Sequence, residues 1–192
     1  MIELKLKRTA LRWDFSFFAV LALFFWLDSS GFGLTTLGVC AAHELAHLAV
    51  MKICGISPEF ITFYGAGIRI TSRQTNLSSP QVQAAVYSAG CLMNFLLAAA
   101  LYALDARGAA VVSLFTGLFN LLPVGEFDGR ALLRILLIRS APPEKVDGIL
   151  TFCGAVSVAV CGVAVAVVGG GGGVTLALTL SYLLYLAIKG VQ

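Results

Sequence analysis

The sequence predicts an all-α integral membrane protein with about six transmembrane helices. Of its 192 residues, 12% are charged and 59% are hydrophobic, whereas a soluble domain carries about 25% charged residues. The mean hydropathy is +0.92, and the apolar residues are gathered into long runs. The small net charge of +3 argues against a nucleic-acid partner, and the predicted environment is the lipid bilayer.

Six apolar segments are the predicted membrane spans. A helix is the expected form of each, because a lipid-exposed backbone must satisfy its own hydrogen bonds. Some segments are shorter than the ~20 residues that a spanning helix needs, and tilting of the lipid or flanking residues can make up the difference. The segments are residues 13–27, 34–54, 82–104, 109–122, 148–168 and 174–188.

The basic residues support this number of spans. In a six-span topology twelve lysines and arginines fall on one side, and Arg107 alone falls on the other. The positive-inside rule then places both termini in the cytoplasm. The alternative is that the first segment, with its basic start and its Ser29-Ser30-Gly31 exit, is a cleaved signal peptide. Cleavage would leave five spans and an external N-terminus.

Residues 60–71 do not have the pattern of a helix. Two β-rich stretches flank Gly65-Ala66-Gly67, which predicts a membrane-associated β-hairpin between the second and third helices. The alternative is a loop that lies on the membrane surface.

Both histidines of the chain lie in the sequence His43-Glu44-Leu45-Ala46-His47, within the second apolar segment. On a helix this spacing places two imidazoles on one face, where they can hold one zinc ion. The glutamate between them can act as a general base. An ionised glutamate at the centre of a membrane helix costs about 2.5–3.5 kcal/mol, so Glu44 needs a functional reason. The alternative is a buried polar cluster that joins helices.

A catalytic zinc usually has three protein ligands, and the third must here be a thiolate or a carboxylate. Cys40 lies on the same helical face, but three ligands within two turns would strain a tetrahedral site. Glu126 and Asp128 follow the fourth span, where the sequence breaks the helix. Asp128 can turn inward at this break; alternatively, both acids are solvated. The helix-breaking residues are Pro123, Gly125 and Gly129.

The His43–His47 motif, followed by Asn120-Leu121-Leu122-Pro123 and then Asp128-Gly129, resembles the site-2 protease family of intramembrane zinc metalloproteases. The resemblance is strongest to the small bacterial branch of the stage IV sporulation protein FB type, and it covers about residues 34–137. Two weaker matches are the 65–67 turn, which resembles the family's glycine-containing hairpin, and residues 90–94, which resemble its GPxxN segment.

The resemblance implies an intramembrane zinc metalloendopeptidase that performs regulated intramembrane proteolysis on membrane-embedded or membrane-associated proteins. It implies one catalytic domain over residues 1–192, without a PDZ or C-terminal regulatory domain, in the bacterial cytoplasmic membrane. A regulatory membrane protein is an expected partner. The implied roles are Zn²⁺ binding by His43, His47 and Asp128; acid–base catalysis by Glu44; and substrate binding by Asn120, Asn94, Gly65 and Gly67.

The chain departs from the family pattern at four positions: Cys91, Gly125, Glu126 and Arg130. Cys91 replaces the proline of GPxxN, and Glu126 offers a second acid near the expected ligand. Three other interpretations stay open. They are another class of membrane protease with the same histidine motif and a downstream glutamate ligand, an inactive scaffold or binding relative, and a metal transporter.

Overall fold

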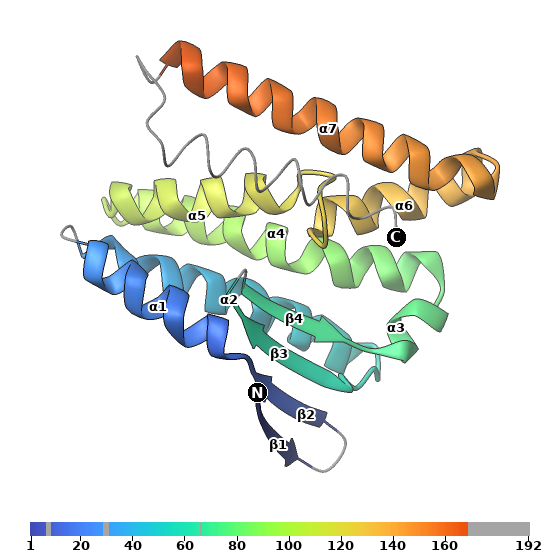
Figure 1. Ribbon diagram of the computed structural model, residues 1–192, viewed down its shortest axis with the longest axis horizontal. Helices are drawn as coiled ribbons and strands as arrows, with labels where there is room; N and C mark the ends of the chain where they lie inside the picture. Colours follow the sequence, from blue (N-terminus) through green and yellow to red (C-terminus); the bar gives the residue numbers. More distant parts are fainter. Residues whose placement is uncertain (7–8, 29–30, 66, 169–192) are drawn as a thin grey trace. The chain divides into compact units, whose positions relative to one another are not determined.

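The computed structural model describes residues 1–6, 9–28, 31–65 and 67–168 (Figure 1). The chain divides into two compact units, Met1–Gly117 and Leu118–Gln192, which are described separately. The strands are β1 (Ile2–Leu6), β2 (Thr9–Trp13), β3 (Phe60–Tyr64) and β4 (Gly67–Thr71). The helices are α1 (Phe15–Leu27), α2 (Phe32–Ile53), α3 (Arg73–Leu77), α4 (Pro80–Ala103), α5 (Arg107–Asn120), α6 (Asp128–Ser140) and α7 (Pro143–Val168).

Three helices among the described residues are long and apolar enough to cross a membrane: Phe32–Ile53, Pro80–Ala103 and Pro143–Val163. Two further expected spans form shorter helices, since α1 has 13 residues and α5 has 14. The span expected at 174–188 lies outside the described residues. The apolar helices agree with an integral membrane protein, and the number of six spans stays a prediction.

The expected hairpin at 60–71 is present, but it belongs to a larger sheet. The four strands lie in the order β1-β2-β3-β4, with β2 parallel to β3 and the other pairs antiparallel. The all-α prediction was therefore wrong for the N-terminal residues. Ile2, Leu4 and Leu6 alternate with polar residues, and this period of two is typical of a strand.

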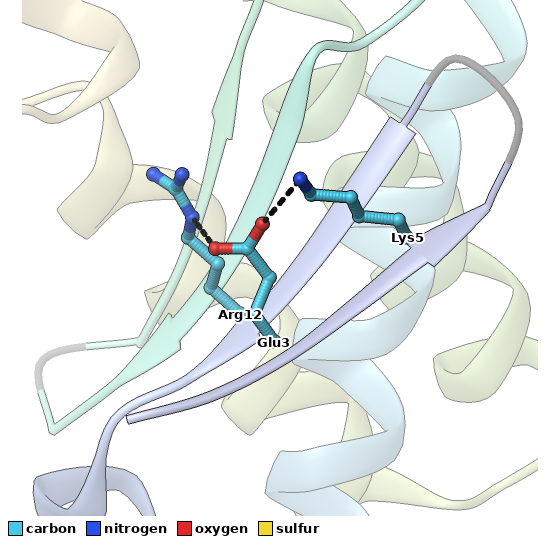
Figure 2. A network of polar contacts seen from close by, with 3 residues as sticks. All are labelled: Glu3, Lys5 and Arg12. Carbon is cyan, nitrogen blue, oxygen red and sulfur yellow. Dashed lines mark hydrogen bonds and ion pairs between the residues drawn. The ribbon is translucent and has the colours of Figure 1, made fainter.

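Glu3, Lys5 and Arg12 form a polar network on one face of the sheet (Figure 2), in which one ion pair joins β1 to β2 and the other lies within β1. Glu3 lies opposite Arg12 in the antiparallel register, and the Arg12 Nε donates to its carboxylate at 3.0 Å. The Lys5 Nζ lies 3.9 Å from the other carboxylate oxygen. Exposed and partly exposed pairs of this kind contribute at most about 1 kcal/mol, so the Glu3–Arg12 pair adds only a small preference for this register.

Helices α2 and α4 pack side by side and form the centre of the first unit (Figure 1). The Ser79 side chain caps the start of α4 by accepting from the Val82 N–H, as is typical of an N-cap. Small residues on the buried face of α4, including Ala89 and Gly90, allow the two backbones to approach closely. Met51 and Val86 add apolar contacts near the end of α2.

In the second unit, the expected helix break is present between the end of α5 at Asn120 and the start of α6 at Asp128. Gly125 has φ +54°, a conformation that favours glycine. Val124 is fully buried in an apolar cluster with Val158 of α7. Gly129 has no room for a side chain, because a Cβ there would overlap the main-chain carbonyl of Leu121. The backbone of this turn therefore depends on glycine at both Gly125 and Gly129.

Candidate metal centre

Helix α2 brings the two histidines together. The side chains of His43 and His47 are 4% and 7% exposed, and their Nε2 atoms lie 3.1 Å apart. A Zn–N distance of 2.0–2.1 Å corresponds to about 3.3 Å between two tetrahedral ligands. The two imidazoles therefore fit two ligand positions of one zinc ion with little movement.

A main-chain carbonyl fixes the orientation of the second histidine. The Nδ1 of His47 lies 2.7 Å from the carbonyl oxygen of Val86 on α4. Because a carbonyl only accepts hydrogen bonds, Nδ1 carries the proton and the Nε2 of a neutral ring keeps its lone pair. Such a contact behind a histidine ligand is typical of metal sites.

An asparagine side chain lies behind the first histidine. The side-chain Nδ2 of Asn94 is 3.1 Å from the Nδ1 of His43, and Asn94 is 0% exposed. The Ser113 hydroxyl donates to the main-chain carbonyl of Asn94 at 2.8 Å. Asn94 was expected to bind substrate; that role stays a prediction, and its contact with His43 is an additional finding.

Gly90 provides the space in which the imidazoles lie. A Cβ at this position would come within 2.5 Å of the His43 Cε1 and Nε2 and would overlap the His47 Nε2. Gly90 and Asn94 are four residues apart on α4 and so share one face of the helix. Apart from the weak match to GPxxN, no sequence pattern indicates that Gly90 lies against the histidines.

The remaining predicted residues lie at three places. Glu44 is half-buried on α2 between the two histidines, and Gly65 and Gly67 lie at the β3–β4 turn. In the second unit, Asp128 is the half-buried first residue of α6, and Asn120 is the half-buried last residue of α5. The joining of Asp128 to the histidines stays a prediction.

The departures from the family pattern are also located. Glu126 is exposed in the turn before α6, which makes it a poorer candidate ligand than half-buried Asp128. Arg130 is 7% exposed; burial lowers the pKa of its guanidinium, an effect that nearby Asp147 opposes. Cys91 is buried on α4, with 2% of its surface exposed.

No protein-family model matches the chain. Two curated proteins, from two strains of Mycobacterium tuberculosis, are both named "Putative zinc metalloprotease Rip3" and are 32% identical to it over 133 residues. The match covers 62% of this chain and 34% of each relative, so the chain spans about a third of their length.

Among solved structures, the fold matches "Site-2 Protease from Methanocaldococcus jannaschii" with a TM-score of 0.69 and 20% sequence identity. The match covers 100% of this chain and 95% of that one. The chain therefore has the fold of that protease.

Proposed function

We propose that this chain is an intramembrane zinc metalloendopeptidase that cleaves membrane-embedded or membrane-associated proteins. The observation that carries the proposal is the pair of buried imidazoles, with Nε2 atoms 3.1 Å apart, on a helix apolar enough to span a membrane. The fold of the archaeal site-2 protease and the similarity to the Rip3 proteins support it. The finer expectation, a relative of the stage IV sporulation protein FB type, rests on the sequence motifs.

The proposed site performs hydrolysis through acid–base chemistry. Zinc, when bound by His43, His47 and Asp128, would lower the pKa of water toward ~7 and polarise the scissile carbonyl. The Glu44 carboxylate takes a proton from the attacking water and later gives it to the leaving amide nitrogen as the C–N bond breaks. The apolar surroundings of α2 strengthen these electrostatic effects by keeping bulk water away.

The proposal includes a membrane arrangement. Residues 1–192 form one metalloprotease domain with six spans and both termini in the cytoplasm of a bacterium, as the basic residues favour. A membrane protein is the expected regulator. Asp128 then lies toward the cytoplasmic side, and cleavage products leave in that direction.

Asp128→Ala and Glu126→Ala together test the third ligand. Asp128→Ala is expected to weaken zinc binding by about 100-fold or more, since it removes a ligand rather than a group behind one. Glu126→Ala is the matched control: it removes a carboxylate two residues away that is exposed to solvent, and zinc binding should stay unchanged. The measurement is zinc affinity of the purified proteins by competition with a chelator.

Loss of zinc binding in Glu126→Ala, with wild-type affinity in Asp128→Ala, would favour a membrane protease class with a glutamate ligand. Retention of wild-type affinity by both variants would contradict the proposed ligand set.

The β3–β4 hairpin is the proposed docking site for a locally unwound substrate, by edge pairing of strands, with Asn120 placing the substrate backbone. Gly67 has φ +133°, and a Cβ at Gly65 would meet Ser16 and Val20 atoms at 3.2 Å. Backbone strain of about 1–3 kcal/mol at Gly67 and overpacking of similar size at Gly65 predict that Gly65→Val and Gly67→Val each reduce cleavage roughly 5- to 150-fold, while zinc affinity stays at the wild-type value.

This prediction is checked by measuring cleavage products and zinc content of the same preparations. Thr71→Val is the matched control, because it keeps a β-branched residue at an exposed position of β4. Unchanged cleavage by both glycine variants would remove the hairpin from the substrate-binding surface.

A further inference from the structure

We propose that Asn94 is a positioning residue for His43, and that its side-chain amide reverses direction when zinc binds. The inference rests on the proposed function, because it concerns how the chain prepares two imidazoles for a cation. Asn94, which was expected to contact substrate, is here assigned to orient the His43 ring from the side opposite the metal.

Three contacts form a continuous line between α4 and α2. The Asn94 Nδ2 lies 3.1 Å from the His43 Nδ1, and the two histidine Nε2 atoms lie 3.1 Å apart. The line ends at the Val86 carbonyl, 2.7 Å from the His47 Nδ1. All of these groups belong to the first unit. The three side chains and the Val86 carbonyl are therefore joined by consecutive contacts of hydrogen-bond length.

One arrangement of protons satisfies this line without a cation. The Val86 carbonyl can only accept, so the His47 Nδ1 is a donor and its Nε2 is an acceptor. The His43 Nε2–H then donates to the His47 Nε2, and the His43 Nδ1 accepts from the Asn94 amide NH₂. A proton occupies the position between the two Nε2 atoms, and the pair cannot bind a cation in this form.

Zinc binding requires a second arrangement. Both Nε2 atoms must be deprotonated to act as ligands, so a neutral His43 carries its proton on Nδ1. That N–H would face the NH₂ of Asn94, which is also a donor. A half-turn of the amide brings the Asn94 Oδ1 to the same place as an acceptor, and the two ends of an amide have nearly the same size.

The surroundings of Asn94 favour this use of the amide. Its Oδ1 is buried and has no hydrogen-bond partner among the residues that the structure describes. Ser113 holds the main chain of Asn94 through its carbonyl, so the amide can turn while the backbone stays in place. With 0% exposure, no solvent can replace the amide. A carboxylate at this position could only accept from the His43 Nδ1–H, as the arrangement with zinc requires. An apolar side chain could neither donate to His43 nor accept from it.

Zinc affinity of three variants tests the role, with Zn²⁺ added to purified, metal-stripped full chain in detergent. Asn94→Leu should bind zinc about 10–100-fold more weakly, as is usual when a group behind a ligand is lost. Asn94→Asp should stay within about threefold of the wild type or bind more tightly, because a carboxylate accepts from Nδ1–H. Asn76→Leu makes the same chemical change at an exposed position of α3 and should leave zinc affinity unchanged.

Wild-type affinity in Asn94→Leu would overturn the inference. So would weaker binding by Asn94→Asp than by Asn94→Leu, since it would mean that His43 needs a donor when zinc is bound. Absence of zinc binding by the wild type would instead contradict the proposed function.

A second measurement uses only the wild-type chain and so does not depend on the folding of a variant. The chain has two histidines, so ¹⁵N-histidine labelling with a non-histidine purification tag gives two ring systems. Without zinc, at a pH where both rings are neutral, one Nε2–H and one Nδ1–H tautomer are expected. With zinc, both should be Nδ1–H. A His43 tautomer that is the same in both states would contradict the reversal of the amide.

Discussion

Gly90→Ala is expected to remove most of the zinc-binding capacity of the chain without touching a ligand. A Cβ at this position would come within 2.5 Å of two ring atoms of His43 and would overlap the His47 Nε2. The rings must turn away or α4 must move, and overpacking of this kind costs about 1–3 kcal/mol or more. Because both Nε2 atoms are displaced together, we expect zinc affinity to fall about 100-fold or more.

The control for this variant is Gly38→Ala. Gly38 lies on α2, the helix that carries both histidines, and a Cβ there would meet no atom within 4 Å. Both variants should be compared for zinc affinity and for helix content by circular dichroism. Near wild-type affinity in Gly90→Ala would show that the rings do not lie against α4 as described.

Glu44→Gln is expected to abolish peptide cleavage while leaving zinc bound. Glutamine keeps the size of the side chain but cannot accept and return a proton, so the general acid–base contribution of about 10²–10⁴-fold is lost. Glu44 follows His43 directly on α2, and it is not one of the proposed ligands. Zinc affinity should therefore stay close to the wild-type value.

Glu144→Gln supplies the matched control, since it makes the same chemical change at an exposed position in the first turn of α7. It should cleave at the wild-type rate. Loss of zinc from Glu44→Gln would indicate that Glu44 binds the ion itself. Full cleavage by Glu44→Gln would contradict the role of Glu44 as the general base and acid.

The sequence predicted the histidine pair because its geometry is local. Four residues correspond to about one turn of helix, so any helix over His43 and His47 must place them together. The hairpin at β3–β4 was also predictable, because β-rich residues flank a glycine turn. Strands β1 and β2 have a weak sequence signal, because the alternation at Ile2, Leu4 and Leu6 is short and lies among basic residues that also indicate membrane topology.

The contacts behind the histidines could not be predicted from the sequence. They depend on how α4 is rotated and shifted against α2, and hydropathy does not determine this. Val86 takes part through its main-chain carbonyl, which carries no sequence signal at all. The spacing of Gly90 and Asn94 matches GPxxN only weakly. Which residue each of them contacts depends on how α4 packs against α2.

The break before Asp128 was predictable for a different reason. Pro123 and Gly125 cannot continue a helix, and the structure ends α5 and begins α6 at the two sides of these residues. The same reasoning does not distinguish the two candidate ligands, because Glu126 and Asp128 are both close to the break. Their difference in exposure is a property of the folded turn.

The most direct test of the proposed protease activity compares new protein N-termini in membranes that contain the wild type with those that contain Glu44→Gln. We predict N-termini that form only with the wild type and that map within or beside membrane-spanning segments of other proteins. Identical N-termini in both membranes, with both proteins inserted, zinc-loaded and equally abundant, would contradict intramembrane proteolysis by this chain.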